Sequence, residues 1–176
     1  MDLERTFQNI EYFQMHSTKE SLKRILKAFS NYETSVGYVQ GMNFIAAVLL
    51  FHAGEVAAFW LLCALMDTYK LKMVLSSGLP GLPGHEERLE RLGREELPKL
   101  FEHFDKMYVT LNLFSTDWII SIFMNFIPIE LTHVYLGLFF EHSWDAFDHV
   151  AISILKFYEK DLMKLNDAGD IVGQIK

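Results

Sequence analysis

The chain has 176 residues, of which 51% are hydrophobic, and it carries a formal net charge of −7. A chain this apolar can bury enough surface to offset its ordering entropy, which argues against a disordered protein. An acidic chain without basic runs is a poor match to nucleic acid. The length suits a single domain over residues 1–176 rather than two.

The sequence also indicates a compartment. The one cysteine, Cys63, cannot form an intrachain disulfide, which fits a reducing environment. The N-terminus lacks the apolar core of a signal peptide. The longest uncharged runs, near residues 56–66 and 118–129, are too short to cross a bilayer and indicate buried helices. We therefore expect a cytoplasmic protein without a transmembrane segment.

Helical spacing of apolar residues dominates the first third of the chain. Ser17 and Glu20 have the spacing of a capping box, which predicts a helix that begins there. Residues 31–37 are polar and predict a loop. An apolar run over residues 41–51 predicts a buried helix, and residues 54–66 predict a second one.

The middle of the chain contains the strongest turn signal. Residues 76–84 include three glycines and two prolines and predict a connection. Residues 85–92 are charged and amphipathic, which predicts one or two helical turns. Pro98 suits the first turn of a further helix, running towards residue 111.

Helical patterns continue to the end of the chain. Asp117 is expected to cap a helix that runs to residue 126 and stops near Pro128. Residues 129–141 and 144–165 predict the remaining helices. Because strand-like alternation never persists, the predicted fold class is all-α, a multi-helix domain packed around one core.

Four segments carry motifs. Residues 36–46 read VGYVQGMNFIA and contain the pattern YxQG, and residues 2–7 read DLERTF and contain DxxR. Residues 55–60 read EVAAFW, and residues 118–123 read WIISIF. Together these motifs resemble the TBC family of GTPase-activating proteins for Rab-type small GTPases. The family's first helices precede residue 1, so we expect a partial domain that starts near the arginine-finger motif.

The resemblance implies that Arg5 is an arginine finger and Gln40 a glutamine finger, both supplied in trans to a GTP-bound Rab. A guanidinium neutralises charge on the transferring phosphoryl group, and a carboxamide can orient the attacking water. Asp2 is expected to orient Arg5 through charge-assisted hydrogen bonds. The positions expected to support the fingers or contact the GTPase are Asp2, Gly37, Tyr38, Gly41 and Asn43.

The same resemblance implies the chemical context. The chain needs no cofactor or metal of its own, because it acts on the GTP and Mg²⁺ that its partner binds. No independent catalytic activity is expected. Peripheral association with endomembranes would come only through partners.

One departure favours an alternative function. The family's late motif, approximately RIWD, aligns with residues 134–137, so Val134 and Gly137 replace its Arg and Asp. With the absent first helices, this change supports the alternative of a TBC-like scaffold that binds a GTPase or another partner without stimulating hydrolysis, whereas the intact Arg5 and Gln40 argue for the activator.

A third hypothesis is a helical metalloenzyme. One acidic and histidine-rich cluster has the spacing of a single helical face and the N and O ligands that zinc accepts. Polar residues at this spacing are more typical of a solvated helix face. The cluster consists of His142, Asp145, Asp148 and His149.

Overall fold

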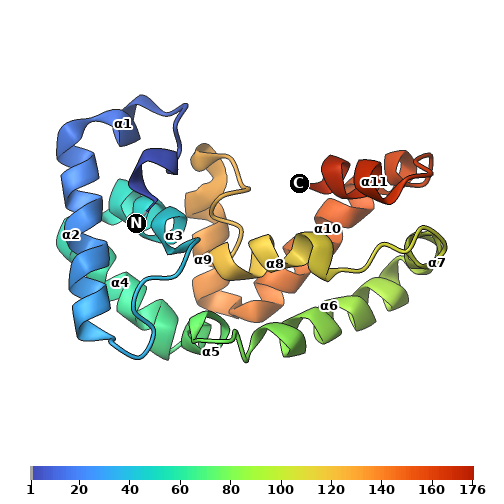
Figure 1. Cartoon of the computed structure of the whole chain (residues 1–176), viewed down its shortest axis with the longest axis horizontal. Helices are drawn as coiled ribbons and strands as arrows, with labels where there is room; N and C mark the ends of the chain where they lie inside the picture. The colour runs from blue at the N-terminus through green and yellow to red at the C-terminus, as the bar shows by residue number, and fades with distance from the viewer. Residues whose placement is uncertain (1) are drawn as a thin grey trace.

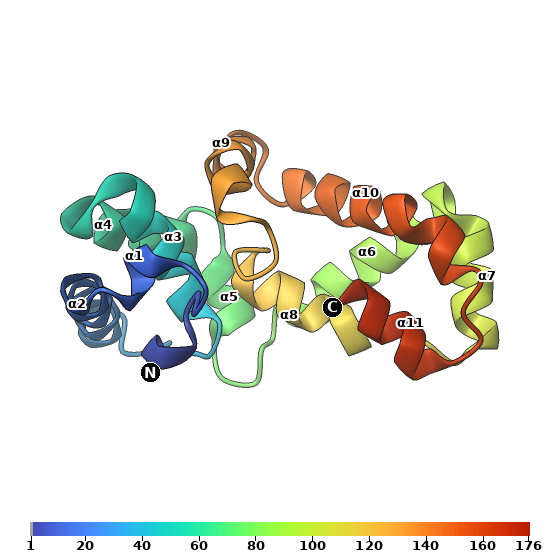
Figure 2. The ribbon, with the colours of Figure 1, turned by 90° about the horizontal axis from the view of Figure 1, so that it is seen from above.

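The structure, a computed structural model, describes residues 2–176, and within that range it contains helices and no strand. Figure 1 shows two groups of helices with a smaller set between them, and Figure 2 shows the same division from above. The all-α fold class is confirmed.

The helices have the following bounds. The first group comprises η1 (Leu3–Arg5), α1 (Glu11–Gln14), α2 (His16–Tyr32), α3 (Met42–Ala53) and α4 (Glu55–Asp67). The second comprises α6 (Leu82–Glu96), α7 (Pro98–Lys106), α10 (Trp144–Leu162) and α11 (Ala168–Ile175). Between them lie α5 (Leu71–Leu75), α8 (Asn112–Ser121), η2 (Ile129–Leu131) and α9 (Thr132–His142). None of these helices is both long and apolar enough to cross a bilayer.

A continuous hydrophobic core joins the two groups. Helix α3 is apolar on nearly all sides and is therefore buried along most of its length. Helix α8 contacts α3 and α5 on one side and α6 and α11 on the other. Its Trp118 is only 1% exposed and packs against the rings of Phe114 and Phe123. The aromatic side chains of α8 thus connect the two ends of the molecule.

The capping box predicted at Ser17 is wrong, because α2 begins one residue earlier. Met15 is the N-cap, in an extended conformation, and no side chain caps the helix. The Lys19 amide donates to the Met15 carbonyl at 3.1 Å, so the helical hydrogen bonds already begin there. Ser17 and Glu20 therefore lie inside the first turns of α2.

The helix predicted between Asp117 and residue 126 is also misplaced. Helix α8 starts at Asn112, and Asp117 lies in its interior. It ends where Ile122 and Phe123 adopt left-handed conformations, with φ of 44° and 63°. Both side chains are fully buried, and Phe123 stacks on Phe147 with ring centroids 4.6 Å apart. Tertiary packing therefore stabilises a backbone that local sequence disfavours.

The predicted connection is shorter than expected. The chain is non-helical over residues 76–81, apart from turns, and α6 begins at Leu82. Pro83 falls in the first turn of α6, where its missing N–H removes no hydrogen bond. The charged turns expected from residue 85 are part of this longer helix, which reaches Glu96. Helix α7 starts at Pro98, as predicted, but ends at Lys106.

Helix α11 was not predicted, although its signals are present in the sequence. The Asp167 carboxylate caps it by accepting from the backbone N–H groups of Gly169 and Asp170, at 2.8 and 3.1 Å. Ile171 and Ile175, one turn apart, are its buried residues. An N-cap followed by apolar residues at helical spacing is the pattern typical of a short amphipathic helix.

Candidate functional site

Arg5 ends the short helix η1, and its side chain is exposed. The residues after it are anchored in the fold. Thr6 is only 1% exposed, and the Phe7 ring lies 4.9 Å from that of Phe13 and 5.3 Å from that of Phe44, measured between centroids. Chain ends without such contacts usually fray. These contacts hold Arg5 at a defined place on the surface.

Gln40 lies in the loop between α2 and α3 and is also exposed. The next residue, Gly41, has φ of 103°, which side-chain-bearing residues rarely adopt. A Cβ atom at Gly41 would also lie 2.9 Å from Cγ2 of Ile120 in α8. Gly37 supplies a second left-handed position, with φ of 66°. The two glycines let the loop turn tightly against α8 while Gln40 remains at the surface.

A first link joins the Arg5 segment to the Gln40 loop through Asp2 and Tyr38. The Tyr38 hydroxyl donates to Oδ2 of Asp2 at 2.7 Å and accepts from the Asp2 backbone N–H at 3.0 Å. Burial raises the pKa of Tyr38 to about 12. The hydroxyl is therefore protonated at neutral pH and available as a donor.

A second link passes through the buried side chains of Thr6 and Asn43, each 1% exposed. The Asn43 amide donates from Nδ2 to Thr6 Oγ1 at 2.9 Å, and its Oδ1 accepts from the Gly41 backbone N–H at 3.2 Å. The Thr6 hydroxyl in turn donates to the Asp2 backbone oxygen at 2.9 Å. A continuous path of hydrogen bonds thus runs from beside Arg5 to beside Gln40.

The structure links the segments that carry Arg5 and Gln40 but changes one predicted role. No ion pair joins Asp2 to Arg5 within residues 2–176, so the expected charge-assisted contact is wrong. The Asp2 carboxylate binds the Tyr38 hydroxyl instead, because Tyr38 is half-buried beside it. Sequence reasoning missed Thr6. Its only local signal is a hydroxyl next to Arg5, since its partner Asn43 is 37 positions away.

The arrangement presents two different groups on linked surface segments. A guanidinium at Arg5 stabilises negative charge on a bound anion, and a carboxamide at Gln40 can donate to and accept from the same ligand or water. Neither group has a nucleophile or general base joined to it by the hydrogen bonds described above. The pair is suited to completing a reaction centre that another molecule supplies.

The two departures in the late motif lie at the surface of α9. Val134 is 51% exposed, and Gly137 is exposed as well. A Cβ added at Gly137 would meet no atom within 4 Å. The replacement of the family's Arg by Val134 and of its Asp by Gly137 therefore removes two surface charges and leaves no gap in the core.

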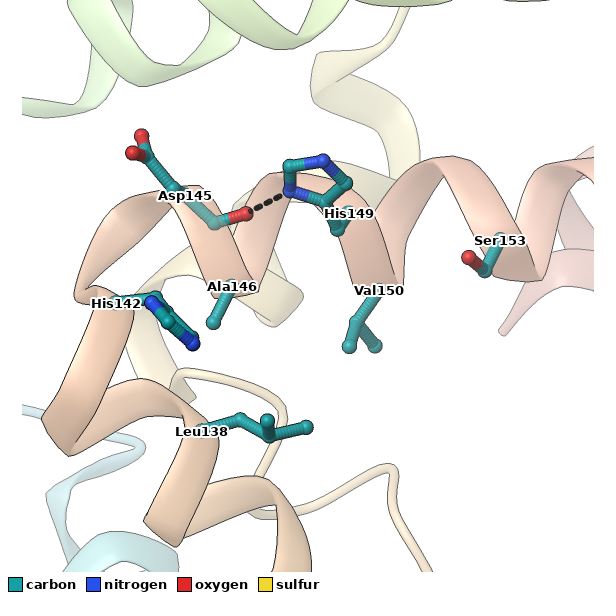
Figure 3. Close-up of a pocket in the computed structure, with 7 residues that line it drawn as sticks. All are labelled: Leu138, His142, Asp145, Ala146, His149, Val150 and Ser153. Carbon is teal, nitrogen blue, oxygen red and sulfur yellow. Dashed lines mark hydrogen bonds between the residues drawn. The ribbon is translucent and has the colours of Figure 1, made fainter.

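The histidine and acidic cluster does not form the single face expected of it. His142 belongs to the end of α9, whereas Asp145 lies in the first turn of the next helix, α10. Both residues line the pocket of Figure 3, where the Asp145 carboxylate points away from the His142 ring. His149 donates from Nδ1 to the Asp145 backbone oxygen at 2.7 Å. Across residues 2–176 no three His, Cys, Asp or Glu side chains converge as metal ligands, which disfavours the metalloenzyme hypothesis.

Asp148 is the member of this cluster that is buried, at 2% exposure. Arg88 of α6 forms an ion pair with it, with Nε 2.5 Å from Oδ2, and Arg88 also pairs with Asp145. Burial raises the pKa of Asp148 from 3.8 to about 6 in spite of the nearby guanidinium. The carboxyl group is therefore a pH-sensitive contact between α6 and α10.

Asp148→Asn is expected to change how stability depends on pH. Because the pKa of Asp148 is higher in the folded chain than in the unfolded chain, protonation of this carboxyl group adds to the free energy of unfolding. This contribution is fully present below pH 3.8 and is lost as pH rises through about 6. The melting temperature of Asp148→Asn minus that of the parent chain should therefore rise by several degrees between pH 4 and pH 7. Asp145→Asn, an exposed partner of the same Arg88, is the control. A difference that stays flat or falls over this range would contradict the assignment.

Comparison with known proteins identifies the family. The Rab-GTPase-TBC domain model matches residues 1–163. Growth hormone-regulated TBC protein 1 of Xenopus laevis is 33% identical over 180 residues, covering 99% of this chain and 52% of that protein. Rab GTPase-activating protein tbc-11 of Caenorhabditis elegans is 28% identical, covering 97% of this chain but 18% of that protein.

Solved structures show the same relationship. The Chlamydomonas flagellar RabGAP TBC domain superposes with a TM-score of 0.86 at 28% identity, over 99% of this chain and 58% of that one. The Ypt/Rab-GAP domain of Gyp1p, at 22% identity and a TM-score of 0.81 over 99% of this chain and 63% of that one, shares the fold. The chain thus belongs to the Rab-GTPase-TBC domain family.

Proposed function

We propose that this chain accelerates GTP hydrolysis by a Rab-type small GTPase, to which it supplies Arg5 and Gln40 in trans. The observation that carries the proposal is that the exposed side chains of Arg5 and Gln40 lie on two segments joined by hydrogen bonds. Membership of the Rab-GTPase-TBC domain family and relatives that are named Rab GTPase-activating proteins support it.

The two side chains address different parts of the reaction. Negative charge develops on the transferring phosphoryl oxygens, and the Arg5 guanidinium neutralises it. An attacking water must be held in line, and the Gln40 carboxamide can accept from that water while donating to a phosphate oxygen. Both interactions strengthen in the transition state, so they raise the rate more than they raise affinity.

The partner supplies everything else that the reaction needs. GTP and its Mg²⁺ are bound by the Rab in its GTP-bound form, and the chain contributes no cofactor and no independent hydrolysis. Recruitment to endomembranes from the cytoplasm would follow from the membrane attachment of the Rab.

The proposal is tested by single-turnover phosphate release from a panel of GTP-loaded Rabs, after circular dichroism has shown that the chain is folded. At least one Rab should be accelerated on the order of 10³-fold or more. Binding is measured in parallel. Tight binding without acceleration would overturn the proposal in favour of a scaffold. The next variant would then restore the family's charges as Val134→Arg and Gly137→Asp. If no Rab in the panel is bound or accelerated, both functions are excluded for those Rabs.

A further inference from the structure

Each of the two fingers is bracketed by residues that connect it to the other. Asp2 and Thr6 stand on either side of Arg5, and Tyr38 and Gly41 stand on either side of Gln40. The Asp2–Tyr38 link is half-buried. The Thr6–Asn43 link is the buried one, with both side chains 1% exposed.

We propose that Thr6 and Asn43 are positioning residues, which set the separation of Arg5 and Gln40 through one buried hydrogen bond. The inference rests on the proposed function and goes beyond the two fingers themselves. Neither side chain reaches the surface, so neither can touch the partner's nucleotide. Their effect must pass through the adjacent backbone of Arg5 and Gly41.

The geometry explains why this bond controls position. Thr6 Oγ1 has a donor and an acceptor role filled at once, to the Asp2 backbone oxygen and from Asn43 Nδ2, both at 2.9 Å. Asn43 uses its other amide atom, Oδ1, for the Gly41 N–H. Every contact in the path thus has a defined direction, and the hydroxyl cannot rotate away without leaving a buried polar group unpaired.

The link holds the two segments together on their buried side, in addition to the half-buried Asp2–Tyr38 link. The Gln40 loop takes left-handed conformations at Gly37 and Gly41, where glycine allows wide backbone freedom. The Arg5 segment is a short 3-10 helix. Misplacing one catalytic group by about 1 Å can cost ~100-fold in rate, so a buried link of defined geometry matters more here than its strength alone.

The test compares Thr6→Val, which keeps the side-chain shape and removes the hydroxyl, with Thr6→Ser, which keeps the hydroxyl. On a responsive Rab, Thr6→Val should lower the stimulated kcat by ~10- to ~100-fold. Its affinity for the Rab loaded with a non-hydrolysable GTP analogue should be unchanged. Thr6→Ser should retain most of the rate. Asn43→Leu removes the donor of the same hydrogen bond and replaces Thr6→Val in the test if that variant does not fold.

A second arm separates positioning from a general loss of stability. In an Arg5→Ala background, the Thr6→Val change should lower kcat by no more than about twofold, because the separation of the fingers no longer matters. Its effect on the melting temperature should be the same in both backgrounds. Equal losses of kcat in both backgrounds, or full activity of Thr6→Val, would overturn the inference while leaving the proposed function intact. A parent chain that stimulates no Rab would instead indicate failure of the proposed function.

Discussion

Arg5→Ala is expected to reduce the stimulated rate of GTP hydrolysis by about 10³-fold or more, and Gln40→Ala by about 10²-fold or more. Both side chains are exposed, and no hydrogen bond or ion pair involving either side chain was found within residues 2–176, so truncation should cost the fold little. Arg5 contributes charge stabilisation, and Gln40 contributes water orientation. Both contributions belong to the transition state, so ground-state binding of the GTP-loaded Rab should change much less than the rate.

Two further variants sharpen this experiment. Arg5→Lys should also fail, because a compact ammonium cannot reproduce the planar donor fork of a guanidinium. The Arg5→Ala/Gln40→Ala double variant should lose less than the product of the two single losses, since groups that act as a unit are not additive. Single-turnover hydrolysis gives the rates, and titration of the Rab gives the affinity. Stimulated rates that are unchanged in both single variants would refute the assignment of the two fingers.

Gly93→Ala is expected to destabilise the fold by about 3 kcal/mol. Gly93 lies in α6, and a Cβ there would sit 2.0 Å from Cζ and 2.3 Å from Cε2 of Phe101 in α7. The Phe101 ring is 3% exposed, so it has no free space into which to move. The clash falls where α6 and α7 pack against each other, and Phe101 belongs to the hydrophobic core.

The matched control lies in the same helix. A Cβ at Gly84 would meet no atom within 4 Å, so Gly84→Ala should be neutral or stabilising by up to ~1 kcal/mol. Denaturant unfolding measures the free energy of both variants. Trimming the ring in a Gly93→Ala/Phe101→Leu double variant should recover part of the loss. Equal stability of Gly93→Ala and Gly84→Ala would show that the Phe101 contact does not limit the packing.

The sequence predicts the helical class well because helical spacing is a local property. The buried helices around residues 41–66 and the helix start at Pro98 follow from apolar runs and from the backbone limits of proline. The end of α8 could not be predicted in this way. Ile122 and Phe123 are left-handed because their side chains fill the core, and that packing involves residues such as Phe147 that are distant in sequence.

In the candidate site, too, local features are predictable from the sequence and long-range contacts are not. Arg5 and Gln40 were predicted from short motifs, because each motif is contiguous in the sequence. The contacts between the motifs depend on the fold, with partners 36 and 37 positions apart. The interaction of Asp2 with Tyr38 rather than Arg5, and the role of Thr6, therefore required the structure.

The central claim is that one chain completes a Rab's reaction centre with two fingers. The most direct test is binding to a responsive Rab loaded with GDP, with and without aluminium fluoride, which with GDP mimics the transferring phosphoryl group. Because transition-state mimics bind at least ~100-fold more tightly than ground-state ligands, a stable complex should form only when aluminium fluoride is present. Arg5→Ala and Gln40→Ala should each abolish this gain. Equal affinity with and without aluminium fluoride, or a gain that survives both substitutions, would contradict the account.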